Sequence, residues 1–427
     1  MQIHHIRKNG NWVSDFPVYY GWVIVAAGTF GLVMTSPGQT YSVSIFIEHF
    51  IRDLGLNRSL VSTLYTVATL IGSFALPLVG RQIDRRGPRL AAVVVAALFG
   101  VACLLMGYVS NAVTLLLGFI AIRMLGQGSL SIVSQNVINR WWVRKRGMVN
   151  GIAGVVAGLV GLGGFPNLIN TLIPLIGWRM TYVALGTLVL LLMVPVGFVF
   201  FRNQPEEYGL QPDGYTPTAA ERDGQTKEVE QHWSIQEALR MPVFWLLALS
   251  LASVSMLSTG QFFHMVSIFA DNGLSATVAA AVFVPIALTT ALVNLGGGIL
   301  ADHVPIRVLL AVGLLLQALS LWMAQFLQGV GVALFYGIIL GATGGLVRAV
   351  GSVVWAKFFG RRHLGSVQGT ASTILVAGSA LGPMPLGIAR DFFGSYNLAL
   401  TGSSLIPLLL AVLCVLFVAK PTKPENT

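Results

Sequence analysis

Two stretches of this chain repeat each other at a constant offset of 218 residues. Asp53-Leu54-Gly55-Leu56 returns as Asp271-Asn272-Gly273-Leu274, and most of each stretch keeps the offset without net insertion. Because both copies are apolar, the repeat predicts two equivalent bundles of membrane helices, the arrangement typical of secondary transporters, whose substrate path lies between the copies. Further matched pairs are Gly80 and Gly298, Asp84 and Asp302, Arg89 and Arg307, Gly151 and Gly369, Gly164 and Gly382, and Trp178 and Tyr396.

The composition supports a membrane protein. Hydrophobic residues make up 55% of the chain and charged residues 10%, whereas soluble domains carry roughly 25% charged residues. A spanning helix needs about 20 apolar residues. The sequence predicts twelve such spans, at residues 18–47, 57–80, 89–109, 112–139, 147–172, 178–201, 241–270, 276–301, 307–327, 329–356, 364–389 and 396–419.

These spans predict an all-α membrane fold of two six-helix repeats. Acidic and turn-forming residues dominate the segment between the repeats, which we interpret as a partly disordered linker. Within it, Ser234 and Glu237 have the spacing of a capping box and predict a short surface helix. The expected divisions are a tail at 1–17, a bundle at 18–201, the linker at 202–240, a bundle at 241–419 and a tail at 420–427.

The basic residues predict the orientation. If both tails and the linker lie in the cytoplasm, the cytoplasmic segments hold 20 of the 26 Lys and Arg residues and the outer loops hold four. This bias follows the positive-inside rule and predicts a multi-pass protein of the inner or plasma membrane. It also accounts for the net charge of +10, so a nucleic-acid partner is not needed to explain it.

The sequence contains no pattern that indicates an enzyme. The two cysteines, Cys103 and Cys414, lie in separate apolar stretches and form no disulfide or metal-binding motif. A nucleophile–base pair and a phosphate-binding loop are also absent from the sequence. We therefore expect neither catalysis nor a bound metal or cofactor.

The loop after the second span carries the first family signature. It runs from Gly80 to Arg89 through Asp84 and Arg85, and it closely resembles the loop signature of the major facilitator superfamily. The second repeat has a weaker version with Gly298, Asp302 and Arg307. The resemblance implies that these charges form a network that breaks when one half rocks against the other. The alternative is that they are ordinary cytoplasmic charges.

Two arginines, Arg123 and Arg348, lie well inside predicted spans, away from the span ends. Arg123-Met124-Leu125-Gly126-Gln127-Gly128 resembles a second signature of the same superfamily, in which the arginine is buried and linked to transport. Arg123 on a lipid-facing surface would cost about 2.5–3.5 kcal/mol or more, so we expect it to face a polar interior together with Gln127. Arg348 lies nine residues before Lys357, about 13 Å from the cytoplasmic boundary. The alternatives are a structural role for Arg123 and snorkelling of Arg348 to the interface.

The buried charges favour an anionic substrate. No Asp or Glu lies in the middle of any predicted span, and a carboxylate is the natural complement of an arginine. His264 could carry a coupling proton, although a neutral hydrogen-bonded role is the alternative. Other candidates for substrate contact are Gln39 and Tyr41 beside a Pro-Gly break in the first span, Gln261 in the seventh and Asn294 in the eighth; each of them could instead join helices.

The fifth span adds a closer resemblance. Trp141-Trp142-Val143-Arg144-Lys145-Arg146-Gly147, followed by Gly151, Gly154, Gly158 and Gly161, resembles the signature of the monocarboxylate transporter and oxalate/formate antiporter group. Thr290 and Asn294 occupy the positions where monocarboxylate transporters carry an acid and an arginine, and the eleventh span lacks the lysine of the antiporters. The binding residues of that group therefore do not carry over.

We predict a transporter that moves a small organic anion, a mono- or dicarboxylate, by alternating access within the lipid bilayer. The substrate would bind between the halves near Arg123 and Arg348, with a proton or a counter-anion as a candidate for coupling. An alternative on the same fold is export of neutral or hydrophobic compounds. A membrane receptor without transport activity is a further alternative, which the short linker and tail disfavour.

Overall fold

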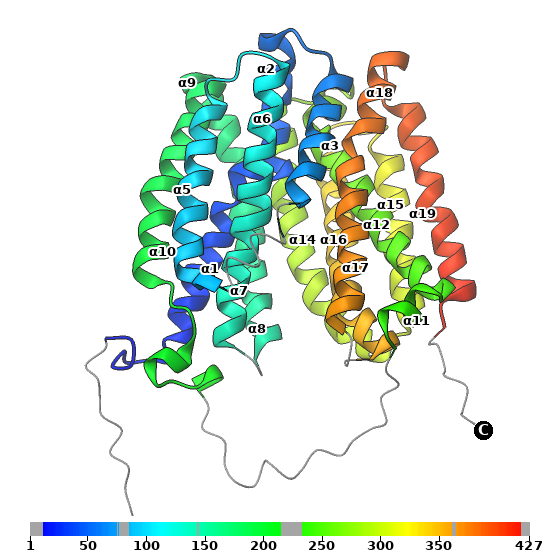
Figure 1. Ribbon diagram of the computed structural model, residues 1–427. Coiled ribbons are helices and arrows are strands. Elements are labelled where there is room, and N and C mark those ends of the chain that lie inside the picture. Colours follow the sequence, from blue (N-terminus) through cyan, green and yellow to red (C-terminus); the bar gives the residue numbers. More distant parts are fainter. Residues whose placement is uncertain are drawn as a thin grey trace, which may run out of the picture.

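The structure is a computed structural model that describes residues 12–74, 76, 85–142, 145–214, 233–360 and 364–419. In these residues it is helical and contains no strand, which confirms the all-α prediction. Figure 1 shows two helical bundles side by side, one from each half of the chain. The start of α1 and the ends of α10 and α19 lie at the same end of the molecule as α11 (Figure 1), which we call the linker end. We call the opposite end the far end.

The N-terminal bundle contains several helices that are interrupted or change type along their length. Its elements are α1 (Gly21–Met34), η1 (Ser36–Gly38), α2 (Thr40–Leu54), α3 (Arg58–Phe74), α5 (Pro88–Met106), α6 (Ala112–Ile122), η2 (Arg123–Leu130), α7 (Ser131–Trp141), α8 (Arg146–Val156), η3 (Ala157–Gly164), α9 (Phe165–Leu188), η4 (Val189–Met193) and α10 (Val194–Phe200).

The C-terminal bundle is more regular. Its elements are α12 (Pro242–Phe263), α13 (Met265–Asp271), α14 (Ala276–His303), α15 (Ile306–Met323), α16 (Val330–Phe359), α17 (Leu364–Leu381), α18 (Pro383–Phe393) and α19 (Asn397–Phe417). Between the bundles lie the short turns η5 (Pro205–Tyr208) and η6 (Pro212–Gly214) and the helix α11 (Ile235–Leu239).

Ten stretches of the described residues are long and apolar enough to cross a membrane. One of them, Gly147–Phe200, is 54 residues long and holds the fifth and sixth predicted spans. They separate at Gly177, whose φ of 75° turns the chain within α9. The second predicted span corresponds to α3, which has 17 residues up to Phe74; residues 75 and 77–84 lie outside the described part. Nine stretches with one span each, the stretch that holds two spans, and α3 together agree with the twelve predicted spans.

The break predicted in the first span is present. Ser36–Gly38 forms one turn of 3-10 helix between α1 and α2, and Gln39 is extended, with φ −84° and ψ 151°. Pro37 lacks an N–H and Gly38 lacks a side chain, which explains why the helix is interrupted here. The fourth and fifth spans contain the π-helical segments η2 and η3, a helix type that is frequent at functional sites.

Two buried hydrophobic cores reveal where the halves meet. The larger core combines the N-terminal bundle with residues from the far-end parts of the C-terminal bundle, among them Phe263 and Phe283. The smaller core, from Trp233 to Val418, contains residues of α11 and the C-terminal bundle but none of the N-terminal bundle. The halves are thus packed together at the far end and have separate cores at the linker end.

The predicted capping box begins α11. The Ser234 N–H donates to Glu237 Oε2 at 2.7 Å, and the Glu237 N–H donates to Ser234 Oγ at 3.3 Å. The preceding Trp233 donates its N–H to the carbonyl oxygen of Phe359 at 3.0 Å. This end of the linker is therefore attached to α16, while residues 215–232 lie outside the described part.

Candidate functional site

The break in the first span brings polar groups to the boundary between the halves. Ser36 Oγ donates to the carbonyl oxygen of Val33 at 2.6 Å, so the 3.0 Å contact between Ser36 and Tyr41 is a hydrogen bond donated by the Tyr41 hydroxyl. The Tyr41 ring lies 6.3 Å from the ring of Phe283 in the opposite half. Tyr41 therefore faces the interface and has a hydroxyl that can change its hydrogen-bond partner.

Gly161 in η3 packs directly against the hydroxyl groups of Ser36 and Tyr41. A Cβ atom at Gly161 would lie 2.9 Å from Ser36 Oγ and 3.1 Å from the Tyr41 hydroxyl oxygen. These distances are shorter than an ordinary van der Waals contact, so glycine permits the fifth span to approach the break this closely. Ser36 and Gly161 were not among the predicted site residues.

Arg348 lies on α16, deep among the helices, but its charged side chain is accessible to solvent. The side chain interacts electrostatically with the Tyr41 hydroxyl of the other half. Among the described residues, none forms a hydrogen bond or an ion pair with its guanidinium group. Gly341 and Gly345 pack against the backbone of Ile286 and Thr290 in α14, so glycine on α16 serves close helix packing beside Arg348.

Arg123, in contrast, is buried and engaged. It exposes 3% of its surface. Its Nε donates to Thr69 Oγ1 at 3.0 Å, and its Nη1 lies 3.3 Å from both the Gly38 carbonyl oxygen and Thr40 Oγ1. The guanidinium carbon lies 4.7 Å from the centre of the Tyr65 ring. All these partners belong to the N-terminal bundle, so Arg123 joins the break of the first span to the second and fourth spans.

The two predicted glutamines of the N-terminal bundle differ in their contacts. Gln39 is half-buried and donates through Nε2 to Thr35 Oγ1 at 3.1 Å. Gln127 lies in η2 one turn after Arg123, and its buried Oε1 has no hydrogen-bond partner among the described residues. An unsatisfied buried oxygen is unfavourable, so Gln127 retains an acceptor that a water molecule or a ligand can use.

Gln261 belongs to a buried polar network inside the C-terminal bundle. Its Oε1 accepts from Gln317 Nε2 at 2.7 Å and from Ser320 Oγ at 3.3 Å, and its Nε2 donates to the Tyr336 hydroxyl at 3.1 Å. Gln317 in turn accepts from Ser258 Oγ at 2.8 Å. The network joins α12, α15 and α16 and leaves Gln261 no exposed surface.

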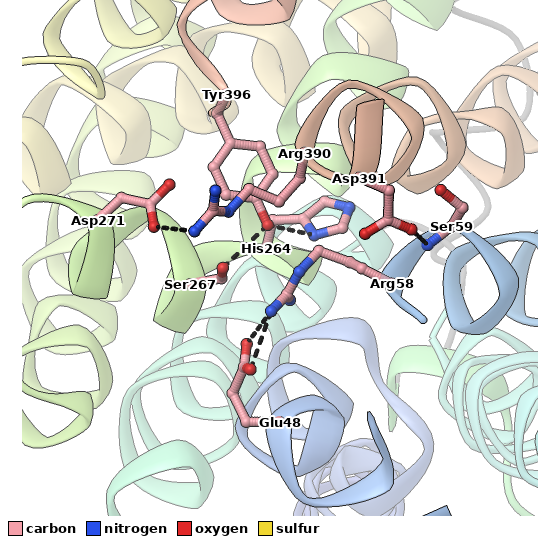
Figure 2. A network of polar contacts seen from close by, with 9 residues as sticks. All are labelled: Glu48, Arg58, Ser59, His264, Ser267, Asp271, Arg390, Asp391 and Tyr396. Carbon is pink, nitrogen blue, oxygen red and sulfur yellow. Dashed lines mark hydrogen bonds and ion pairs between the residues drawn. The ribbon is translucent and has the colours of Figure 1, made fainter. Parts of the chain in front are cut away.

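His264 lies at the far end, away from Arg348. Its Nε2 is 2.8 Å from the carbonyl oxygen of Pro383. Its Nδ1 is 3.2 Å from the hydroxyl oxygen of Tyr396, which lies 3.0 Å from Ser267 Oγ (Figure 2). A carbonyl oxygen can only accept, so Nε2 carries a hydrogen. Asn294 is half-buried on α14, and its backbone N would lie 3.0 Å from a Cβ at Gly345.

The predicted loop network is described only in part. Gly80 and Asp84 lie outside the described residues, as does the side chain of Asp302. Arg85 and Arg307 are exposed. Arg89 donates through Nε to the carbonyl oxygen of Phe198 at 3.0 Å, and its guanidinium carbon lies 4.9 Å from the centre of the Phe198 ring. Arg89 therefore attaches the third span to the sixth. A Cβ at Gly298 would meet open space.

Sequence reasoning missed the contact of Ser36 with Tyr41, the partners of Arg123 and a polar cluster at the far end. Ser36 had a usable signal, because it directly precedes the Pro-Gly pair. Thr69 had none, since its contact with Arg123 spans 54 positions of the chain. The far-end cluster includes Glu48, Arg58 and Asp391 (Figure 2), which the sequence identified only as charges near the ends of spans.

Comparisons with known proteins agree with this architecture. Residues 25–287 and 262–427 match the sequence model of the Major Facilitator Superfamily. The oxalate:formate antiporter of Oxalobacter formigenes is 24% identical over 238 residues, which are 55% of this chain and 52% of that protein, so the match spans about half of the antiporter. The uncharacterized MFS-type transporter YhjX of Escherichia coli strain K12 is 22% identical over 341 residues, 78% of this chain and 79% of that one.

Solved structures share the fold at low sequence identity. The D-xylose-proton symporter superposes with a TM-score of 0.72 at 14% identity, over 94% of this chain and 98% of that one. A bacterial homolog of the human lysosomal transporter Spinster, in an inward-facing and unoccupied conformation, gives a TM-score of 0.69 at 18% identity, over 93% of this chain and 96% of that one.

Proposed function

The chain belongs to the major facilitator superfamily, and from this premise we propose that it transports a small organic anion, a mono- or dicarboxylate, which binds at Arg348. At the level of the family, the chain is a multi-pass membrane transporter that moves a small molecule by alternating access. The proposal concerns the substrate class, the residues that bind it and the orientation in the membrane.

The exposed guanidinium of Arg348 carries the proposal. A charge at membrane depth is expensive unless it faces water or a partner, and none of the described residues neutralises this one. A guanidinium group presents donors in a planar fork that matches a carboxylate. The simplest reason to keep such a group between the halves is an anionic substrate, and the related oxalate:formate antiporter acts on carboxylates.

Tyr41 supports the same substrate class from the opposite half. Its hydroxyl now donates to Ser36, and a small rotation would let it donate to a carboxylate held by Arg348. Phe283 beside Tyr41 and Phe262, whose ring lies 5.7 Å from that of Phe283, supply an apolar surface towards the far end. A substrate between Tyr41 and Arg348 would thus contact both halves, which alternating access requires.

The other predicted residues receive different roles in this proposal. Arg123 holds the break of the first span in place and does not contact the anion directly, since its Nε and Nη1 donate within its own half and the residue is buried. Gln127, Gln39 and Asn294 would orient the ligand. We leave Gln261 and His264 out of the binding site because their polar atoms are engaged inside the C-terminal bundle.

We place the linker end in the cytoplasm. The bias of basic residues towards that end supports this orientation. Because the cores of the two halves join at the far end and are separate at the linker end, the structure corresponds in this orientation to an inward-facing state. Arg348 would then be reached from the cytoplasm.

Thermal stabilisation of the purified protein tests the proposal. A panel of mono- and dicarboxylates and size-matched neutral compounds is added to the protein and to Arg348→Gln, with Arg240→Gln as a control that removes an exposed charge at the linker end. A carboxylate at 100 times its Kd should add about 2.7 kcal/mol of stability. We expect that gain in the parent and the control but not in Arg348→Gln. Stabilisation by neutral compounds alone would refute anion transport and favour the exporter alternative.

A further inference from the structure

A cluster of charged and polar side chains lies at the far end, outside the proposed binding site. Figure 2 shows Glu48, Arg58 and Ser59 of the N-terminal bundle facing Asp391 and Arg390 of the C-terminal bundle. These residues come from α2, α3 and α18. The cluster therefore spans the boundary between the halves at the end where the halves are packed together.

One short hydrogen bond crosses that boundary. The backbone N–H of Ser59 donates to Asp391 Oδ2 at 2.7 Å, over 332 positions of the chain. Ser59 lies in the first turn of α3, where N–H groups lack partners within the helix and the helix dipole favours a negative charge. Asn57 already accepts from the N–H of Leu60 at 2.8 Å. Asp391 thus caps a helix of the opposite half through a donor that Asn57 does not satisfy.

The residue next to each partner is fixed within its own half. Arg58 donates through Nη2 to both carboxylate oxygens of Glu48, at 2.7 and 2.9 Å. Arg390 donates through Nη2 to Asp271 at 2.8 Å. These two pairs hold the start of α3 and the end of α18 in position, so the bond between Ser59 and Asp391 joins two anchored elements.

The described part of the chain contains four hydrogen bonds between the bundles, and this one alone has a charged acceptor. The others are Ser59 Oγ to the Gly387 carbonyl oxygen at 3.2 Å, Asn167 to the Ala280 carbonyl oxygen at 3.0 Å and Asn170 to Thr277 at 3.2 Å. A charged acceptor makes the stronger bond. Because the Ser59–Asp391 bond is exposed, water can replace either partner when the halves separate.

We propose that Asp391 and the N-terminus of α3 form a latch that holds the far end closed and opens in every transport cycle. The latch acts between the halves and does not depend on the identity of the substrate. Breaking it shifts the population towards the state that is open at the far end, because the bond exists only when the far end is closed.

A reporter cysteine measures how often the far end opens. Ser62 is buried on α3, against Gly387 of the opposite half, so Ser62→Cys would react with a membrane-impermeant maleimide from the far side only when the halves separate there. Cys103 and Cys414 are buried. Adding Asp391→Asn should raise the labelling rate about tenfold, because it replaces the charged acceptor of the Ser59–Asp391 bond by a neutral amide oxygen and removes the favourable charge at the helix N-terminus.

Asp53→Asn is the matched control. Asp53 is also a far-end carboxylate, but its partners Arg52, Trp178 and Arg179 belong to its own bundle. This variant should leave the labelling rate of Ser62→Cys unchanged. An unchanged rate in Asp391→Asn would overturn the latch, as would an equal rise in both variants, which would indicate general loosening.

A second variant removes the donor instead of the acceptor. Ser59→Pro deletes the N–H at a position in the first helical turn where proline is tolerated, and Ser59→Ala removes the hydroxyl but keeps the N–H. We expect Ser59→Pro to raise labelling about as much as Asp391→Asn, Ser59→Ala to raise it less, and the combination of Ser59→Pro with Asp391→Asn to add nothing further. Additive effects would show that the two groups do not act through a shared bond.

Discussion

The guanidinium group of Arg123 donates a 3.3 Å hydrogen bond to the carbonyl oxygen of Gly38, across 85 positions of the chain. Gly38 ends the turn that interrupts the first span, where the carbonyl group has lost its regular helical partner. Arg123 therefore stabilises the break that presents Ser36 and Tyr41 to the interface between the halves. A residue from a segment that resembles a transport signature can thus act by holding the site in shape.

Replacing Arg123 should lower stability as well as substrate binding. Arg123→Gln leaves the Gly38 carbonyl oxygen and Thr69 without their donors in a buried region, and we expect a loss of about 3 kcal/mol of unfolding free energy. Thermal unfolding in detergent measures this loss. Arg123→Lys should fall between the parent and Arg123→Gln, because lysine keeps the charge but not the planar fork. An Arg123→Gln protein of parental stability would contradict the structural role.

Replacing Arg348 should affect binding with little change in stability. The side chain is exposed and makes no hydrogen bond within the described residues, so few folded-state contacts are lost. Arg348→Lys should weaken anion binding about tenfold and Arg348→Gln about a hundredfold, as a bidentate contact and then the charge are removed. Titration of binding to the purified variants measures both. If Arg348→Gln unfolds as readily as Arg123→Gln, Arg348 is a structural residue.

Tyr41→Phe should weaken anion binding while the protein stays folded. The change removes the hydroxyl that we propose turns from Ser36 to the substrate, and the loss of one hydrogen bond to a charged group corresponds to roughly a tenfold rise in Kd. The Phe283 contact through the ring is retained. Neutral ligands, if any bind, should be unaffected, and this difference is the control.

Gly161→Ala should disturb the same hydroxyl from the other side. Its Cβ would lie 2.9 Å from Ser36 Oγ and 3.1 Å from the Tyr41 hydroxyl oxygen, so one of the two side chains must move by a few tenths of an ångström. We expect KM for uptake to rise severalfold. Gly158→Ala is the matched control, since a Cβ there meets open space. Equal kinetics in the two variants would argue against a role for this contact.

Gln261→Leu should lower stability without changing which substrate binds. The substitution removes the acceptor of Gln317 Nε2 and the donor to the Tyr336 hydroxyl in a buried region, at a cost of about 1–3 kcal/mol. Thermal unfolding should show this loss, while the order of ligand affinities in the carboxylate panel stays the same. A changed order would place Gln261 in the binding site.

Local features of the sequence were sufficient for the architecture. The 218-residue repeat and the long apolar runs predicted two six-helix bundles because a helix in lipid must satisfy its backbone internally and must be long enough to span. Pro37 and Gly38 predicted the break in the first span, since both act on the backbone at their own positions. The capping box of α11 was equally local, with its two residues three positions apart.

The roles of the two arginines depend on tertiary structure. In the sequence, Arg123 and Arg348 are both single cations in apolar spans, and a role in substrate binding is open for each. The fold brings Thr69, Gly38 and Thr40 to Arg123 and leaves Arg348 exposed between the halves. Likewise Asp391 reaches Ser59 only because the two bundles meet at the far end. The sequence by itself determined the helices and the break, because these follow from local backbone physics, and the repeat is read directly from it. Contacts between distant residues decided which charges are satisfied, since burial and hydrogen bonding exist only once the helices have packed.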